Sequence, residues 1–349
     1  MRAILSTVGT SLPGNAKRAG QATTPASLAA FLAHTDPVLA SAEAHALFRL
    51  GAGGDDRLVF IHSADDACRA AAEALRSHHA NRGVGARCVE VPGLTASEKG
   101  FARRGLRDLV SVLAGEVRRQ RHDGREVLLN ATGGFKAEIA YATLLGLLLE
   151  VPVYYIYETF QQIVELPPLP VAWDLGLMAL HEGFFQWIEE EPRPSGQVRE
   201  RLRELPPALG MLVDEPEEGR QYLSAAGVAF WEAYRERSER AGRARVLLSE
   251  AARRDHEALD PTTRAAFDRR LASLRARELW IGQCETVGAG GVRVYPRGDT
   301  NERIFLVEGD GGEVRVLGLT RHSDGSYEQR RSAVRAPAPG ERFSEWEGP

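Results

Sequence analysis

Apolar residues in the first 170 positions fall into two alternating patterns. Short, wholly apolar runs are typical of buried strands, and longer segments with apolar residues at helical spacing are typical of amphipathic helices. The apolar runs predict strands at residues 3–8, 58–62, 87–91, 126–130 and 151–157, with 162–166 as a hairpin partner of the last. The helical spacing predicts helices at about residues 66–80, 101–120 and 135–149. Apolar strands that alternate with helices predict a parallel sheet covered on both faces.

The pattern changes after the proline-rich segment at residues 166–170, which we interpret as a linker. The elements expected beyond it are helices at 175–191 and 197–204, a hairpin of 209–213 with 220–223, and a helix at 225–237. This order is typical of a winged helix. The alternative is an interdomain spacer that binds no DNA. The turn at residues 214–219 favours the spacer, because its acidic side chains would repel phosphate.

The last third of the chain predicts helices followed by an antiparallel sheet. The elements expected there are helices at 240–256 and 261–279, strands at 291–295, 303–308 and 313–319, and a loose tail from residue 336. Residues 309–312 (GDGG) are a hairpin turn signal between the last two strands. This segment therefore predicts a small α+β domain.

Composition excludes several classes of protein. A chain of 349 residues with 43% hydrophobic and 26% charged residues is typical of two or three globular domains. The most apolar stretch, residues 140–149, ends at Glu150 and is too short to span a membrane, so we expect no membrane association. Three cysteines without paired spacing indicate neither a disulfide framework nor a zinc site, and the cytoplasm is the expected location.

Two polar loops follow predicted strands of the N-terminal sheet. Residues 9–11 (GTS) follow the first strand, and residues 132–136 (TGGFK) follow the strand at 126–130. Ligands of open parallel sheets bind at the carboxyl ends of the strands, where the strand order reverses. Glycine lets backbone N–H groups approach phosphate, the helix that begins near Phe135 adds partial positive charge, and Lys136 adds a full charge. The loops predict an anion site; simple turns with a surface lysine are the alternative.

Neither loop fits the common nucleotide motifs. Ala137 stands where a Walker A loop needs serine or threonine for magnesium, which disfavours hydrolysis of nucleoside triphosphates. No GxGxxG sequence opens the first helix, as a dinucleotide site would require. We therefore expect phosphate binding without a metal and without a cofactor.

Residues 5–12 (LSTVGTSL) and residues 130–136 (NATGGFK) together resemble the two signature loops of CRISPR-associated Rossmann-fold (CARF) domains. The resemblance covers about residues 1–170. It implies a homodimer that binds a cyclic oligoadenylate made by type III CRISPR systems, and we expect cyclic tetra-adenylate as the allosteric activator. A two-fold dimer presents its loops twice, which suits a cyclic messenger with an even number of units. The residues expected to bind it are Gly9, Thr10, Ser11, Ser63, Thr132, Gly133, Gly134, Phe135 and Lys136.

The C-terminal strands concentrate arginine. Residues 261–335 carry 13 arginines and 10 acidic residues, although the net charge of the whole chain is −4. Alternate residues of a strand share a face, so Arg293 and Tyr295 should point one way and Val292 and Val294 the other. The order of two helices and an antiparallel sheet, with clustered arginines, resembles RelE-type toxins over about residues 240–332. Those are small ribonucleases that cut messenger RNA on the ribosome; their usual lysines are absent from this segment.

Metal-free RNA cleavage uses the RNA's own 2′-hydroxyl as nucleophile, so the enzyme must transfer protons and stabilise charge. Arginine stabilises charge but is a poor base because it stays protonated, whereas histidine and tyrosine suit proton transfer. The residues expected to be catalytic are Arg293, Arg297, Arg303, Arg321, His322 and Tyr327. The alternative places Tyr295 and Phe305 in the core, the arginines in solvent and His322 in a loop.

The expected fold is a multidomain α/β chain. Its parts are a Rossmann-like CARF sensor at 1–170, a winged-helix-like linker at 171–238, a RelE-like α+β domain at 239–335 and a tail at 336–349. The expected function is antiviral defence, in which the messenger activates a metal-independent endoribonuclease that cuts messenger RNA with the ribosome as partner. Two alternatives remain. One is a ligand-controlled winged-helix regulator that binds DNA, and the other is a ring nuclease that degrades the messenger.

Overall fold

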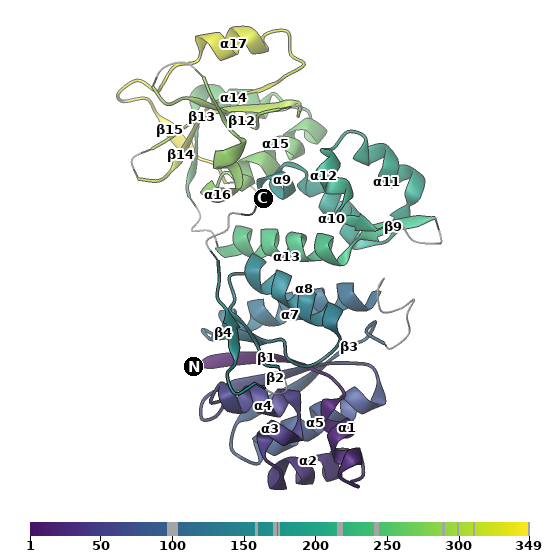
Figure 1. The fold of residues 1–349 in the computed structure, drawn as a ribbon. Helices are drawn as coiled ribbons and strands as arrows, with labels where there is room; N and C mark the ends of the chain where they lie inside the picture. Colours follow the sequence, from purple (N-terminus) through teal and green to yellow (C-terminus); the bar gives the residue numbers. More distant parts are fainter. Residues whose placement is uncertain are drawn as a thin grey trace. The chain divides into compact units, whose positions relative to one another are not determined.

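The computed structural model divides the chain into two compact units (Figure 1). Unit 1 comprises Met1–Ala172 and Ile188–Ala233, and unit 2 comprises Trp173–Trp187 and Tyr234–Pro349. The residues expected to form a separate middle domain, 171–238, are thus shared between the two units. The structure describes residues 1–95, 104–157, 160–169, 173, 175–214, 219–240, 244–287, 290–298, 300–309 and 311–347.

Unit 1 is built on a six-stranded sheet with the order β3-β2-β1-β4-β5-β6. Its strands are β1 Arg2–Val8, β2 Arg57–Ser63, β3 Gly85–Val91, β4 Glu126–Asn130, β5 Val153–Tyr155 and β6 Val164–Leu166. The first five are parallel and β6 is antiparallel to β5, which confirms the predicted sheet. Because β1 pairs with β2 on one side and with β4 on the other, the strand order reverses between β1 and β4. A ligand site is therefore expected where these two strands end.

Helices cover both faces of this sheet (Figure 1). The helices α7 Leu106–His122 and α8 Lys136–Leu148 lie on one face, and α5 Asp66–Ala80 lies on the other. On the α5 face, Leu28, Phe60 and Leu75 are fully buried in one apolar core. The helix expected from residue 101 is present from residue 106, and residues 101–103 lie outside the described residues.

The connection between β1 and β2 contains four helices that the hydrophobic pattern did not predict. They are α1 Ser11–Arg18, α2 Pro25–His34, α3 Pro37–Ala40 and α4 Ala42–Arg49. Their start signals are present in the sequence, since Thr24, Asp36 and Ser41 each accept a backbone N–H at a helix start. The segments are only four to ten residues long, so each has too few turns for helical spacing of apolar residues to be recognised.

The later part of unit 1 contains the predicted hairpin. Its elements are β7 Arg193–Pro194, α11 Ser195–Leu202, α12 Pro207–Gly210, β8 Val213–Asp214, β9 Arg220–Leu223 and the first part of α13 Ala225–Arg240. The strand β9 pairs antiparallel with both β8 and β7. The first hairpin strand was expected from residue 209, but it begins at residue 213 because Pro207 starts a short helix. Residues 215–218 of the acidic turn lie outside the described residues.

Unit 2 contains a second six-stranded sheet, with the order β11-β12-β13-β14-β10-β15. Its strands are β10 Val246–Ser249, β11 Glu285–Thr286, β12 Arg293–Tyr295, β13 Glu302–Glu308, β14 Val314–Arg321 and β15 Phe343–Glu345. Its helices are α9 Gly176–Leu180, α10 Glu182–Glu190, α14 Glu250–Glu257, α15 Pro261–Ser273, α16 Arg277–Trp280, α17 Tyr327–Ala333 and the 3-10 helix Ile281–Gln283. The unit boundaries fall within α10 and α13. The predicted antiparallel pairing of β12, β13 and β14 is confirmed.

Several segments of unit 2 differ from the predictions. The helix expected at 261–279 is two helices, α15 and α16. The helix expected at 240–256 is interrupted, because Val246 and Leu248 enter the core as part of β10, which pairs parallel with β14. The expected tail contributes β15, which pairs with the other edge of β10. The helix expected at 175–191 is two helices, α9 and α10, which meet at His181.

The two faces of the unit 2 sheet have separate cores. Tyr295 is fully buried in the core beneath α14 and α15, where its hydroxyl group lies 2.9 Å from that of Ser273. Val292 and Val294 are buried in the opposite core, with Phe305 and Tyr327. The predicted facing of these β12 side chains is therefore confirmed.

Candidate ligand-binding site

The two predicted loops of unit 1 lie against each other at the ends of β1 and β4. A Cβ atom added to Gly9 would lie only 2.7 Å from the backbone nitrogen of Gly134. The hydroxyl group of Thr7, on β1, donates a hydrogen bond of 2.6 Å to the carbonyl oxygen of Gly133. The loops form one wall of a cavity of about 310 Å³, which we name the loop cavity. Its lining residues are Val8, Gly9, Thr10, Ser11, Ala42, Glu43, Cys68, Thr132, Gly133, Gly134, Phe135 and Glu138.

Glu43 of α4 is a site residue that the sequence analysis missed. Its side chain is fully buried, and its carboxylate accepts hydrogen bonds from the backbone N–H of Gly9 at 2.8 Å and from the Ser11 hydroxyl at 2.9 Å. A buried carboxylate needs such donors, because an unpaired charge away from water is costly. Two of the donors that we expected to bind phosphate, Gly9 and Ser11, therefore hold the Glu43 carboxylate in this structure, and their contact with a ligand stays a prediction.

Glu138, in the first turn of α8, is the second buried carboxylate of the loop cavity. It accepts a hydrogen bond from the backbone N–H of Phe135, the residue that precedes the helix. Burial raises the pKa of Glu138 to about 7; the Asp65 carboxylate also raises it, and the Phe135 hydrogen bond opposes the rise. Gly134 has a φ of 99°, and a Cβ atom there would collide with the Glu138 carboxylate. Both its backbone conformation and the nearby Glu138 carboxylate therefore require glycine at position 134 of the second loop.

The other expected site residues divide into buried and exposed groups. Thr132 donates to the Asn130 side chain at 2.7 Å and accepts the Ile156 backbone N–H at 3.2 Å, so its hydroxyl holds the loop in place. Ser63 is buried, donates to Asp65 at 2.9 Å, and does not line the loop cavity. Thr10, Phe135 and Lys136 are exposed. The exposed residues and the N-terminus of α8 therefore remain at the rim to contact an anion.

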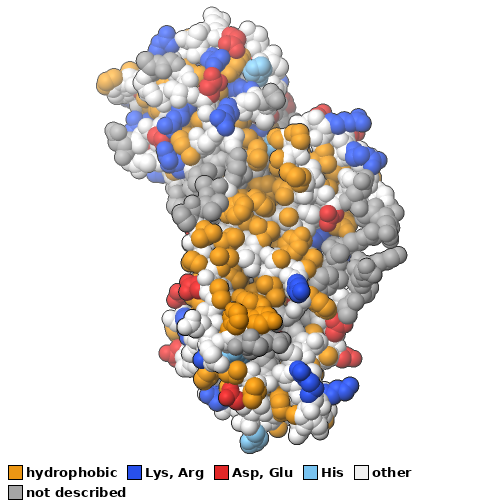
Figure 2. Space-filling model, in the orientation of Figure 1, with side chains coloured by type: hydrophobic (Ala, Val, Ile, Leu, Met, Phe, Trp, Pro, Cys, Tyr) orange, Lys and Arg blue, Asp and Glu red, His pale blue; other side chains and the backbone are white. Residues whose placement is uncertain are grey.

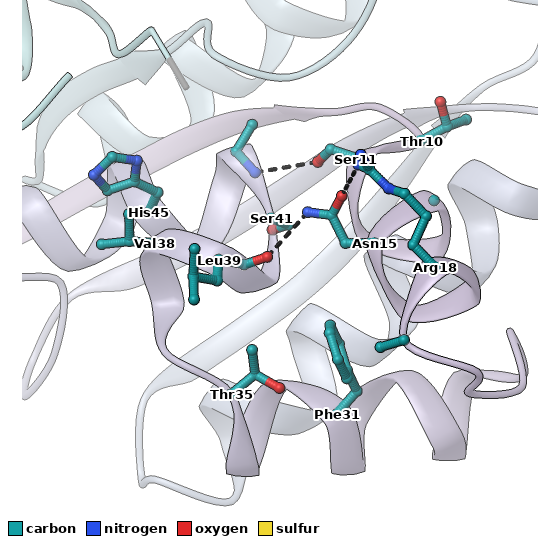
Figure 3. A pocket seen from close by; sticks show the side chains of 13 residues that line it. Thr10, Ser11, Asn15, Arg18, Phe31, Thr35, Val38, Leu39, Ser41 and His45 are labelled. Atoms are coloured by element: carbon teal, nitrogen blue, oxygen red, sulfur yellow. Dashed lines mark hydrogen bonds between the residues drawn. The ribbon is translucent and has the colours of Figure 1, made fainter. Parts of the chain in front are cut away.

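A second and larger cavity of about 730 Å³ adjoins the loop cavity and shares Thr10, Ser11 and Ala42 with it (Figure 3). We name it the helix cavity, because α1, α2, α3 and α4 form its walls. Its lining residues are Thr10, Ser11, Gly14, Asn15, Arg18, Ala19, Phe31, Thr35, Val38, Leu39, Ser41, Ala42 and His45. No pattern in the sequence predicted it, since its walls are the four helices that the hydrophobic pattern missed.

The structure brings three of the expected catalytic residues of unit 2 together. The Arg303 guanidinium lies 5.9 Å from the centre of the Tyr327 ring, and the His322 ring lies 5.0 Å from that ring. Arg303 is only 3% exposed, and its guanidinium donates to the backbone carbonyl groups of Gly298, Thr300 and Glu302. It therefore holds the turn before β13, and its predicted contact with substrate phosphate does not fit this placement.

Tyr327 is only 5% exposed and stacks on Phe305. Its ring belongs to the core beneath α17, so the predicted proton transfer to or from substrate does not fit either. Tyr327 follows the last predicted strand, as expected, and is the first residue of α17, a helix that the sequence analysis did not predict.

The remaining expected catalytic residues, and His322 with them, are more accessible. Arg293 binds Glu308 at 2.7 Å and shares the sheet face of Tyr295, opposite Arg303. Arg321 is exposed and pairs with Asp324 at 3.2 Å, and Arg297 and His322 are exposed. Of the six, Arg297, Arg321 and His322 are thus the ones that a substrate can reach without a rearrangement of the core.

Two further observations concern the described part of the chain. No three His, Cys, Asp or Glu side chains among the described residues are grouped as metal ligands would be. No described helix is long and apolar enough to cross a bilayer.

Residues 38–169 match the model of a family described as CRISPR-associated protein (Cas_APE2256). The matched segment contains Glu43, the second loop and Glu138, but neither the first loop nor any residue of unit 2. The match confirms, for this segment, the expected similarity to CRISPR-associated proteins.

Two solved structures are also similar to this chain. The crystal structure of protein VC1899 from Vibrio cholerae has 10% identity and a TM-score of 0.30, over 66% of this chain and 64% of that chain. The structure of Can2 from Sulfobacillus thermosulfidooxidans, in complex with cyclic tetra-adenylate, has 13% identity and a TM-score of 0.27, over 90% of this chain and 78% of that chain. Similarities with TM-scores of this size do not establish a shared fold.

The close packing of the loops predicts that Gly133→Ala destabilises unit 1. A Cβ atom at Gly133 would collide with the Glu43 carboxylate and lie 2.6 Å from the Thr7 carbonyl oxygen. Overpacking of this kind costs about 2 kcal/mol, so calorimetry should show a melting temperature lower by roughly 5 °C. The matched control is Gly14→Ala in α1, where a Cβ atom meets nothing within 4 Å. That variant should melt at or slightly above the wild-type temperature. A Gly133→Ala protein as stable as wild type would contradict the packing.

The raised pKa of Glu138 predicts that the free energy of unfolding of unit 1 depends on pH. Because its pKa is raised from 4.5 to about 7, the free energy of unfolding should fall as pH rises from about 4.5 to 7. Glu138→Gln keeps an acceptor for Phe135 but has no charge. It should therefore be more stable than wild type by about 2 kcal/mol at pH 8 and nearly equal to it at pH 4.5. Glu126→Gln, at an exposed position on β4, is the control for removal of one carboxylate. A stability difference for Glu138→Gln that does not change with pH would contradict the assignment.

Proposed function

We propose that unit 1 senses a cyclic oligoadenylate, cyclic tetra-adenylate in particular, and that unit 2 is a ribonuclease under its control in a type III CRISPR defence. The observation that carries the proposal is the contact between the two glycine loops at the ends of β1 and β4. Both loops resemble the signatures of cyclic-oligoadenylate sensors, and the second lies within the CRISPR-associated family match.

The charges at the site support binding of phosphate at the rim and not inside the loop cavity. The buried Glu43 carboxylate would repel a phosphate group that entered, and Glu138 would do so once ionised. At the rim, Lys136 supplies an exposed positive charge and Thr10 an exposed hydroxyl group. The first N–H groups of α8 supply further donors, aided by the helix dipole. A large polyanionic ring is the kind of ligand that contacts a rim in this way.

An exposed apolar surface on unit 1 supports a homodimer. Phe135, Tyr157, Phe160 and Val164 are each about half exposed, and the rings of Tyr157 and Phe160 lie 5.2 Å apart. Val164 belongs to β6, the edge strand of the sheet. Figure 2 shows hydrophobic side chains gathered over α8, which begins next to Phe135. A patch of this kind is typical of an interface, and a two-fold interface would place two copies of the loops around one cyclic ligand.

The ribonuclease half of the proposal rests on the exposed residues of unit 2. Arg297 and Arg321 are cations that can stabilise charge on a pentacoordinate phosphorus, and His322 can accept the proton of the 2′-hydroxyl or protonate the leaving 5′-oxygen. The Tyr327 ring lies against His322, so we assign Tyr327 and Arg303 to the support of this loop and not to contact with RNA. This chemistry needs no metal. Messenger RNA on the ribosome is the proposed substrate.

A second candidate function is cleavage of the messenger within unit 1. Glu138 favours it by its position in the lining of the loop cavity, next to the rim where the phosphates are proposed to lie. Its carboxyl, whose pKa burial raises to about 7, is suited to take a proton from a ribose hydroxyl group that reaches into the cavity. This activity would persist after His322→Ala, whereas cleavage of messenger RNA would not.

The proposal predicts that messenger RNA in a bacterial translation extract is cut only when both the protein and cyclic tetra-adenylate are present. Lys136→Ala should require about tenfold more cyclic tetra-adenylate for the same cleavage, because it loses one charge-assisted contact. Arg119→Ala is the matched control, since Arg119 is an exposed cation in the last turn of α7, before β4 begins. It should behave as wild type. RNA length is measured on a denaturing gel.

His322→Ala separates the two halves of the proposal. It should reduce RNA cleavage at least about 100-fold while leaving the affinity for cyclic tetra-adenylate unchanged. Intact RNA under every condition, with the messenger still bound, would contradict the ribonuclease and leave the sensor. Cleavage that does not depend on the messenger would contradict the control of unit 2 by unit 1.

A further inference from the structure

The β1–β2 connection is longer than the fold requires. A crossover between parallel strands needs a dozen or more residues, usually one helix, whereas here residues 9–56 supply four helices. These helices enclose the helix cavity of about 730 Å³, a volume in the range typical of small-molecule sites. The additional helices therefore do more than cover the sheet, since they build a second concave surface.

The helix cavity opens beside the candidate phosphate rim. Thr10 and Ser11 belong to both cavities, so a ligand that contacts the rim at Thr10 can place an attached group in the helix cavity. Of the described residues that line it, only Arg18 carries a full charge at neutral pH. The cavity is thus suited to an uncharged polar group that is connected to an anion.

The lining combines a ring, apolar side chains and hydrogen-bonding groups. Figure 3 shows Phe31 of α2 pointing toward Asn15 and Arg18 of α1. Leu39 of α3 is 68% exposed, although it is a large apolar side chain on the wall of a cavity. Thr35 on the same wall supplies a hydroxyl group. A flat, partly polar heterocycle could cover Leu39 and stack on Phe31 at the same time.

The polar groups of the cavity are held in fixed positions. The Asn15 side-chain amide donates to the carbonyl oxygens of Leu39 and Ala40 at 3.1 Å each, and so ties α3 to α1. Arg18 donates to the Asn15 side-chain oxygen. Arg49 donates to Nε2 of His45 at 3.2 Å, which leaves the hydrogen of a neutral imidazole on Nδ1. His45 is only 1% exposed, so this hydrogen bond fixes the inner wall of the cavity. The groups left for a ligand to contact are Arg18, Thr35 and Phe31.

We propose that the helix cavity holds a nucleobase of the bound cyclic oligonucleotide, with Phe31 as its stacking surface, and that this cavity favours a purine over a pyrimidine. The proposal rests on the proposed sensor function. A purine has the larger stacking area and ring-nitrogen acceptors, whereas a pyrimidine would leave part of Phe31 and Leu39 uncovered. Phosphates remain at the rim, near Thr10 and Lys136.

The test compares cyclic tetra-adenylate with cyclic tetra-uridylate by titration calorimetry on the full chain. The variant is Phe31→Leu, which keeps an apolar side chain in the core but removes the aromatic face. Wild type should prefer the adenylate, and Phe31→Leu should weaken adenylate binding at least about fivefold and uridylate binding less. Lys136→Ala should weaken both ligands by the same factor. Phe48→Leu is the matched control, because Phe48 is an exposed ring on α4 that does not line this cavity.

Three outcomes would overturn the proposal. If wild type and Phe31→Leu prefer the adenylate over the uridylate by the same factor, the base binds outside the helix cavity. The sensor function would not be affected by that result. An equal loss in Phe48→Leu would mean that the effect comes from the stability of the helices and not from stacking. Failure of wild type to bind either ligand would remove the sensor function and this proposal with it.

Discussion

The Glu43 carboxylate lies beneath the two glycine loops without contact with solvent, and a charge in that position must be held by donors that surround it. Gly9 and Ser11 supply them from the first loop, and Gly133 of the second loop approaches the same carboxylate so closely that no side chain fits there. The loop positions, the glycines and the start of α1 therefore follow from one buried group on α4. The same charge also explains why a polyanionic ligand would be bound at the rim.

The N-terminal sheet and its two loops could be predicted because their signals are local. Apolar runs define the strands, and glycines with hydroxyl residues directly after a strand define the loops. Glu43 could not be predicted in this way, since it lies 34 residues from Gly9 in the chain and meets it only when α4 packs beside β1. The position of Glu138 could be predicted in part, because a glutamate in the first helical turn is typical of a helix start. Its burial depends on how the two loops meet.

In unit 2 the candidate catalytic residues could be named from the sequence, but their surroundings could not be predicted. Arg303, His322 and Tyr327, which the sequence pattern grouped as candidates, lie together in the structure. Whether a side chain faces substrate or core depends on tertiary packing, however. The helix α17 places Tyr327 on Phe305, and the turn before β13 surrounds Arg303 with carbonyl groups. The sequence around an arginine at the start of a strand therefore does not show whether it binds phosphate or the backbone of the preceding turn.

The central claim is that two copies of unit 1 bind one cyclic oligoadenylate between their loops. The most direct measurement is the stoichiometry of cyclic tetra-adenylate binding to the full chain, obtained by calorimetric titration together with the mass of the complex in solution. We expect saturation at one ring per two chains and a complex with the mass of a dimer. Saturation at one ring per chain, with the mass of a monomer, would contradict it, as would the absence of saturable binding.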